Sequence, residues 1–182
     1  MKKVVVILAP GFEEIEAVSI IDVLRRAGAA VTVAALGDSR EVCGSHGIPV
    51  LADVQLAAVD AAAAEMVVLP GGMPGSVNLA RSEAVVRLLQ AVSGRGGLVA
   101  AICAAPLALA AAGLLAGRKY TCYPGVEKEI GLPGFTGSRV EEDGPVVTGQ
   151  SAGAALEFSL ALVSHLRGPA LAASLRQSLM MK

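Results

Sequence analysis

The sequence lacks any concentration of basic residues. Its 15 Lys and Arg are balanced by 16 Asp and Glu, giving a net charge of -1 at pH 7, and no basic run is interleaved with aromatic side chains. Binding to nucleic acid depends on clustered Lys and Arg, because these residues neutralise the phosphates. We therefore expect no nucleic-acid partner.

Cysteine is also scarce. Cys43, Cys103 and Cys122 are an odd number of thiols, with no CxxC pair and no His-rich ligand spacing. The pattern indicates neither a disulfide framework nor a zinc site. Free thiols suit a reducing compartment, so we expect a cytoplasmic protein that holds no metal.

Targeting and membrane signals are missing from the pattern as well. Two lysines at residues 2 and 3 precede an apolar run, which ends at Pro10 and Gly11. Acidic residues follow, a pattern unlike that of a secretory signal peptide. No apolar stretch continues without breakers for the roughly 20 residues that a membrane-spanning helix needs. We expect no membrane partner.

What the chain has in excess is apolar sequence. Its 182 residues are 54% hydrophobic and only 17% charged, which excludes a disordered chain and indicates elements buried on more than one face. This length suits one substantial core rather than two. We expect a single domain over residues 1–182, built as a layered α/β sandwich.

Four short apolar runs indicate the strands of a parallel sheet. Continuous β-branched runs suit strands that are covered on both faces; they occupy residues 4–9, 31–36, 65–69 and 98–102. Between the first two runs, apolar residues at helical spacing continue to Gly28, which predicts a right-handed βαβ crossover. The predicted architecture has a central, mostly parallel sheet with helices on both faces.

Other segments predict elements around this sheet. Glycine and proline between residues 43 and 56 favour a small hairpin, and Asp143-Gly144 favours a second hairpin within residues 140–148. Apolar spacing predicts three further helices, over residues 107–115, 152–166 and 169–180.

Cys103 is the first candidate for chemistry. It follows the run Leu98–Ile102 directly, and Pro106 suits the first turn of the next helix, because the N–H that proline lacks has no partner there. Thiols at helix N-termini have lowered pKa values, so we expect a reactive thiolate at a nucleophile elbow. The alternative is a small buried hydrophobe, the commoner role of a free cysteine.

A glycine-rich turn follows the run at residues 65–69. Gly71 and Gly72 allow backbone N–H groups to point into a cleft, where they could hold an oxyanion. The alternative is an ordinary turn between a strand and a helix. The chain contains neither GxGxxG nor GxxxxGK[ST], so the turn is not a phosphate loop.

Glu16 is the candidate acid. It lies four residues before Ile20 and seven before Val23, so on a helix it joins an apolar stripe, whereas Glu13 and Glu14 face solvent. Burial would raise its pKa and let it stay protonated beside Cys103. The alternative is an acid that only compensates the helix dipole.

Five segments together carry a resemblance to a known family: APGFEEIEAV, VVLPGGMPG, AAICAAP, TCYP and RVEEDGPVVTGQSAG. In this order they resemble the ThiJ/PfpI superfamily, and within it the Parkinson-disease-associated deglycase and YajL-like branch. The resemblance implies a flavodoxin-like three-layer sandwich of the class I glutamine-amidotransferase type, and a homodimer. It also implies that Cys103 is the nucleophile, Glu16 its acid, and Gly71, Gly72 and Ala104 the backbone donors.

The sequence departs from the superfamily's proteases at two positions. Ala104 follows the cysteine where PfpI-type proteases have histidine, and Tyr123 precedes a proline where other members have histidine. The only histidines are His46 and His165, so a Cys-His dyad has no evident base. The resemblance places His46 near an arginine of its relatives that reaches toward the partner subunit's site.

These features leave three functions to compare. The resemblance implies an enzyme that needs no cofactor and acts on reactive dicarbonyls, either as small aldehydes such as methylglyoxal or as glycated side chains. A second hypothesis is a redox-responsive stress or chaperone protein, in which Cys103 is oxidised to sulfinate. An amidase or peptidase is less favoured, because the histidines are missing.

Overall fold

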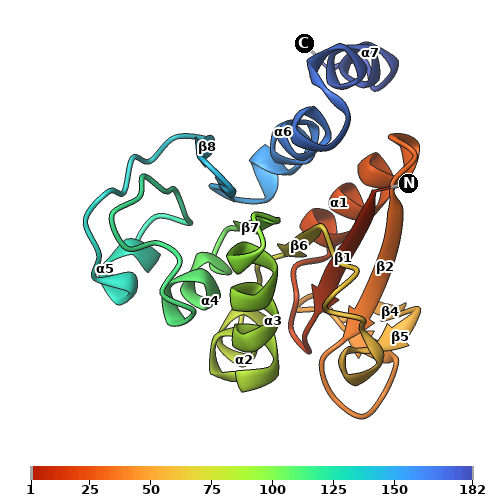
Figure 1. The fold of residues 1–182 in the computed structure, drawn as a ribbon. Helices are drawn as coiled ribbons and strands as arrows, with labels where there is room; N and C mark the ends of the chain where they lie inside the picture. Colours follow the sequence, from red (N-terminus) through yellow and green to blue (C-terminus); the bar gives the residue numbers. More distant parts are fainter. Residues whose placement is uncertain (1, 182) are drawn as a thin grey trace.

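The computed structural model describes residues 2–181 and is built around a seven-stranded sheet (Figure 1). The strand order is β5-β2-β1-β6-β7-β9-β8, and every neighbouring pair is parallel except β8 with β9. The strands are β1 (Lys3–Leu8), β2 (Ala30–Ala35), β5 (Val54–Gln55), β6 (Met66–Leu69), β7 (Leu98–Ile102), β8 (Val140–Asp143) and β9 (Val146–Gly149). The predicted mostly parallel, flavodoxin-like sandwich is confirmed.

Helices cover both faces of this sheet. One layer contains α1 (Glu14–Arg26), α6 (Ala155–Arg167) and α7 (Pro169–Ser178), and the other contains α2 (Gly75–Arg81), α3 (Glu83–Gly94), α4 (Pro106–Ala111) and α5 (Val126–Ile130). Alternate residues of β1 enter the two cores: Val4 and Val6 lie in the first, Val5 and Ile7 in the second. This alternation explains why the run is apolar throughout, since both faces of the strand are buried.

Smaller elements complete the described chain. β3 (Glu41–Cys43) and β4 (Pro49–Leu51) form a separate antiparallel hairpin, and two 3-10 turns are η1 (Leu56–Ala58) and η2 (Ala152–Ala154). Both predicted hairpins are present, although the first is shorter than expected. No helix within residues 2–181 combines the length and the apolar character that crossing a bilayer requires.

Helix ends differ most from the sequence-based predictions. The helix predicted over residues 107–115 ends at Ala111, because Gly113 has φ +75° and Leu114 N–H donates to Leu109 C=O. Such a left-handed glycine terminates a helix by satisfying its last carbonyls. Helices α2, α3 and α5 had no sequence-based prediction.

The parallel topology brings three turns to one edge of the sheet. β1, β6 and β7 are neighbours that run in the same direction, so the turns that follow them share the carboxyl edge, where ligands of open α/β sheets bind. Phe12 N–H donates to Ala9 C=O, and Glu13 N–H donates to Gly71 C=O. The start of α1 is thereby joined to the turn after β6.

A pair of glycine substitutions tests this account of helix ends. Gly28 closes α1 with φ +73°, and a Cβ there would meet only Arg167 Nη1 at 3.9 Å, an ordinary contact, so Gly28→Ala should cost about 1 kcal/mol through backbone strain. Gly94 is the last residue of α3 and has open space where a Cβ would lie, so Gly94→Ala should stabilise by about 0.5 kcal/mol. Urea midpoints measure both, and equal effects of the two changes would contradict the explanation.

Candidate active site

Cys103 lies at the corner between β7 and α4, in a backbone conformation that side chains rarely adopt. Its φ is +64°, and such left-handed residues cost about 1–3 kcal/mol unless their surroundings hold them. Cys103 N–H donates to Gly149 C=O at 2.9 Å, and its own C=O accepts from Tyr123 N–H at 2.8 Å. These two backbone hydrogen bonds fix Cys103 at the elbow that the sequence predicts.

Glu16 reaches the same corner from α1. Its side chain is completely buried, and Oε2 accepts a hydrogen bond from Gly71 N–H at 2.7 Å. Oε1 has no conventional donor within the described residues, and the carboxyl interacts with the Cys103 thiol. Glu16 is thus neither a solvated acid nor a simple first-turn charge.

Burial dominates the acidity of Glu16. The pKa of Glu16 is raised from 4.5 to about 7 as the net of four causes: desolvation is the largest and raises it, the hydrogen bond from Gly71 N–H lowers it, the charge of Glu13 raises it, and the hydrogen bond from Cys103 lowers it. This confirms the predicted raised pKa. A carboxyl that titrates near neutral pH is suited both to accept and to donate a proton under physiological conditions.

The thiol differs from the sequence-based expectation of a lowered pKa, which is wrong for this structure. Burial raises the pKa of Cys103 to about 12, and the Glu16 carboxylate adds to the shift, while the N–H groups of Gly72 and Ala104 oppose it. The reason is that Cys103 is enclosed beside an acid. The following helix begins only at Pro106 and has six residues, so its dipole is weak.

Above pH 7 the two groups together hold one proton. With Glu16 titrating near 7 and Cys103 near 12, the prevailing state above pH 7 is a carboxylate beside a thiol. Transfer of that proton produces a neutral carboxylic acid beside a thiolate, and the Gly72 and Ala104 amides stabilise the new charge. Within residues 2–181, Glu16 is thus the titratable side chain that contacts the thiol, whereas both histidines bind other acids.

The two glycines of the turn after β6 have different tasks. A Cβ on Gly71 would lie 2.5 Å from Cys103 Cβ and 2.8 Å from Glu16 Oε2, so only glycine fits between the two groups. Gly71 N–H binds the acid, whereas Gly72 N–H acts on the sulfur. The predicted cluster of donors is thus divided between Glu16 and the thiol.

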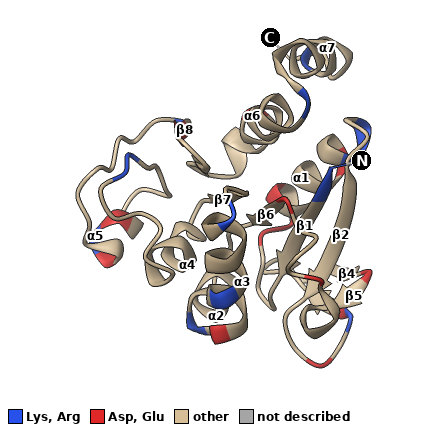
Figure 2. Cartoon of the chain, in the orientation of Figure 1, with Lys and Arg blue, Asp and Glu red and all other residues tan. Residues whose placement is uncertain are grey.

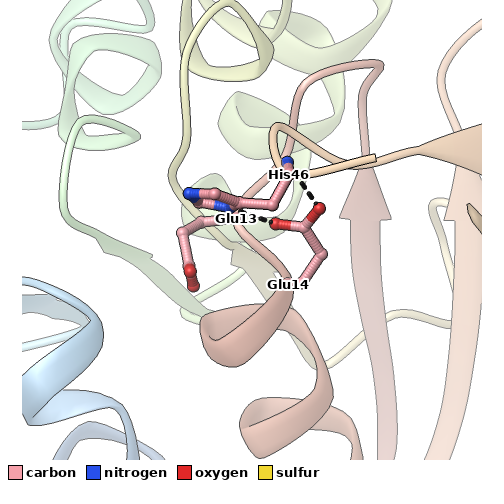
Figure 3. Close-up of side chains that lie close together, drawn as sticks. All are labelled: Glu13, Glu14 and His46. Carbon is pink, nitrogen blue, oxygen red and sulfur yellow. Dashed lines mark hydrogen bonds and ion pairs between the residues drawn. The ribbon is translucent and has the colours of Figure 1, made fainter. Parts of the chain in front are cut away.

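Glu14 was expected to face solvent, and this prediction is wrong. Figure 3 shows its carboxylate turned toward His46, in the loop between β3 and β4. Glu14 Oε1 accepts from His46 N–H at 2.7 Å and Oε2 pairs with His46 Nδ1 at 2.8 Å. The hairpin covers Glu14, a long-range contact that helical spacing cannot reveal.

This ion pair changes the acidity of both partners. Burial raises the pKa of Glu14, but hydrogen bonds from the His46 ring and from the His46 and Ile48 amides outweigh it and lower the pKa to about 2. The hydrogen bond to Glu14 raises the pKa of His46. Both shifts favour the charged forms of the pair, which fastens the hairpin to α1.

Within residues 2–181, both histidines pair with acids rather than with Cys103. His46 binds Glu14, and His165 Nε2 lies 2.7 Å from Glu142 Oε2. Potential ligand atoms of Glu13, Glu14 and His46 lie within 4.8 Å of one another. Glu14 already engages several donors of the hairpin loop, and the Glu13 carboxylate points away from that pair (Figure 3). The arrangement is therefore that of a structural ion pair.

The fold and site define a parallel three-layer α/β protein with an elbow cysteine beside a buried acid. A model of the DJ-1/PfpI family matches residues 2–165, and the chain belongs to this family. The Danio rerio protein named Parkinson disease protein 7 homolog is 40% identical over 186 residues, covering 100% of this chain and 98% of that protein. The resemblance inferred from the five segments is confirmed.

Other relatives agree with this assignment. The Caenorhabditis elegans protein named glutathione-independent glyoxalase DJR-1.2 is 34% identical over 171 residues, covering 92% of this chain and 90% of that protein. The structure of Drosophila melanogaster DJ-1beta has a TM-score of 0.95 and 38% identity, covering 100% of this chain and 98% of that one. Oxidized Toxoplasma gondii DJ-1 has a TM-score of 0.94 and 38% identity, with coverages of 99% and 98%.

The buried acid should be visible in the pH dependence of stability. Because the folded-state pKa of Glu16 is raised from 4.5 to about 7, its contribution is fully present below pH 4.5 and is lost as the pH rises through 7. The difference amounts to about 3 kcal/mol, at about 1.4 kcal/mol per pKa unit. Glu16→Gln should therefore gain about 3 kcal/mol relative to wild type between pH 4.5 and 8.

Chemical unfolding at several pH values measures this gain. Glu83→Gln is a suitable control, because Glu83 is an exposed first-turn acid paired with Arg87. A pH-independent difference between wild type and Glu16→Gln would contradict a buried, titrating Glu16.

Proposed function

We propose that the chain is a cofactor-independent enzyme that converts reactive dicarbonyls, such as methylglyoxal, to hydroxy acids or removes their early adducts from side chains. One observation carries this proposal: a buried carboxyl with a pKa of about 7 contacts a cysteine whose sulfur also receives two backbone N–H groups. The site thus combines a nucleophile, a base and an oxyanion-type donor set.

The first step follows from the shared proton. Glu16 accepts the proton of the Cys103 thiol, and the sulfur adds to the aldehyde carbon of the substrate. The carbonyl oxygen then receives this proton from Glu16, which gives a neutral hemithioacetal and restores the carboxylate. The backbone N–H groups of Gly72 and Ala104 stabilise the negative charge of the transient thiolate, because both already interact with the sulfur of Cys103.

The second step moves a hydrogen between adjacent carbons. The Glu16 carboxylate removes the proton from the former aldehyde carbon and delivers it to the neighbouring ketone oxygen, which gives an enediol. It then takes the hydroxyl proton of the first carbon and delivers it to the neighbouring carbon, which gives the thioester of the hydroxy acid. Water then cleaves the thioester, releasing the hydroxy acid and the thiol. Every proton passes through Glu16, so no metal or cofactor is required.

Two relatives bear on the choice of function. The C. elegans relative carries glyoxalase in its name, which supports the dicarbonyl reaction. The name of the T. gondii structure describes that protein as oxidized, and the groups around Cys103 would also stabilise a sulfinate. Redox sensing through Cys103 is therefore the second candidate. Peptide hydrolysis is disfavoured, because both histidines bind other acids.

A homodimer is part of the proposal. Exposed apolar side chains occur on α1 and on the β3–β4 hairpin, including Val18 at 54% and Leu51 at 66% exposure. Val18, Leu51 and Val50 line one shallow hollow. Asp22, Arg25 and Asp53 line the same hollow, so exposed apolar side chains there are grouped with charged ones. Exposed apolar side chains grouped in this way are typical of an interface, and we propose a second copy of the chain as its occupant.

Substitutions at the site test the reaction. Cys103→Ser should abolish methylglyoxal turnover, and Glu16→Gln should lower it about 10²–10⁴-fold, since Gln cannot relay a proton. Glu16→Asp should retain part of the rate, because it keeps a carboxyl with shorter reach. The wild-type rate should fall as the pH drops below 7, where Glu16 becomes protonated.

Cys43→Ser is the matched control, because Cys43 is an exposed thiol outside the site. Intact-mass analysis after mild peroxide separates the two candidate functions. If Glu16→Gln turns over like wild type while Glu16→Asp forms less sulfinate, the proton relay through Glu16 is wrong, and stabilising oxidised Cys103 is the better assignment for this acid. If neither wild type nor any variant turns over methylglyoxal, the dicarbonyl reaction is wrong.

The oligomeric state is testable by light scattering on the purified chain. Wild type should have the mass of a dimer, and Val18→Glu should shift it toward the monomer, because an exposed charge replaces an apolar contact. Glu83→Gln should leave the mass unchanged. A monomeric wild type at every concentration would refute the proposed interface.

A further inference from the structure

We propose that Glu13 is a positioning residue, which holds Glu16 in place and sets the pH at which the Glu16–Cys103 pair becomes reactive. Glu13 immediately precedes α1, and Figure 2 shows acidic residues gathered at this end of the helix. The inference rests on the proposed function for its catalytic meaning. The predicted effect of Glu13 on the reactivity of Cys103 can be measured without a substrate.

Three hydrogen bonds connect Glu13 to the reacting groups. Glu13 Oε2 accepts from Glu16 N–H at 2.7 Å, which makes Glu13 the N-cap of α1. Glu13 N–H donates to Gly71 C=O at 2.8 Å. Gly71 N–H in turn donates to Glu16 Oε2 at 2.7 Å. Glu13 thus binds the main chain of Glu16 directly, and it binds the carboxyl of Glu16 through Gly71.

The turn after β6 is pressed against Glu13. A Cβ on Gly72 would lie 2.4 Å from Glu13 N, so the backbone of Glu13 packs directly on Gly72. Gly72 N–H is one of the two amides that act on the Cys103 sulfur. Displacement of Glu13 would therefore disturb the acid and a thiol donor together.

Glu13 also acts through its charge. Glu16 faces two titratable groups that affect it: Glu13 at the start of its own helix and Cys103 from the turn after β7. The Glu13 charge raises the pKa of Glu16, in the same direction as burial. An ordinary N-cap such as serine would satisfy the helix end without this charge, so the choice of glutamate has an electrostatic consequence.

The cap and the charge can be separated by substitution. Glu13→Gln keeps a carbonyl oxygen that can accept from Glu16 N–H but removes the charge, whereas Glu13→Ala removes both. Ser82→Ala is a matched control, since Ser82 caps α3 by accepting from Val85 N–H. Glu83→Gln controls for loss of an exposed helix acid.

The readout is the rate at which iodoacetamide alkylates Cys103, followed by intact mass from pH 5 to 9.5. All variants carry Cys43→Ser, because Cys43 is exposed. The wild-type rate should rise with a midpoint near the pKa of Glu16, about 7, and then level off. Methylglyoxal turnover is measured on the same proteins.

Glu13→Gln should move the midpoint to lower pH by roughly 0.3–1 unit, as expected for removing one like charge at short range, with an unchanged plateau. Glu13→Ala should show the same shift, a several-fold lower plateau, and a melting temperature lower by about 2–4 °C from the lost cap. Ser82→Ala should lower the melting temperature alone.

An unchanged midpoint in Glu13→Gln would overturn the electrostatic role, and a Glu13→Ala protein that differs from wild type only in melting temperature would reduce Glu13 to a structural cap. Failure of the proposed function is distinguishable from both. In that case no variant turns over methylglyoxal, yet the alkylation midpoints still report on Glu13.

Discussion

The buried contact between Glu16 and Cys103 is the interaction on which the site depends. Two acidic groups occupy one enclosed corner, and the low polarity there makes two negative charges unfavourable, so above pH 7 the pair still holds one proton. The fold supports this arrangement at a cost in stability above pH 7, because Glu16 is completely buried. Such a cost is typical of a functional site rather than of a structural core.

The rest of the architecture explains why this contact is possible. Parallel pairing of β1, β6 and β7 brings the start of α1, the glycine turn and the cysteine elbow to the same edge. Gly71 leaves room for the acid to approach the thiol, since any Cβ there would collide with both. Hydrogen bonds to Gly149 and from Tyr123 hold Cys103 in its left-handed conformation. Backbone geometry therefore holds the acid and the thiol in contact.

Much of the fold and of the site could be predicted from short segments of the sequence. The continuous β-branched runs predicted β1, β2, β6 and β7 within a residue or so, because a strand buried on both faces must be apolar throughout. The spacing of Glu16 with Ile20 predicted a carboxyl on the buried side of α1. The helices at residues 75–94 were not predicted, and the end of α4 was misplaced, since a left-handed Gly113 rather than the apolar pattern decides it.

By itself the sequence determined the α/β class, the elbow at Cys103 and the buried side of α1 on which Glu16 lies, because these follow from periodicities and from residues near each other in the chain. That Glu16 meets Cys103 was implied by the family resemblance. Only the tertiary structure decided the acidities. The thiol pKa depends on enclosure and on a carboxylate from another element, not on the short helix that follows it. Likewise Glu14 is buried because a hairpin some thirty residues away folds over it and supplies His46. Desolvation and long-range pairing arise only when distant segments meet.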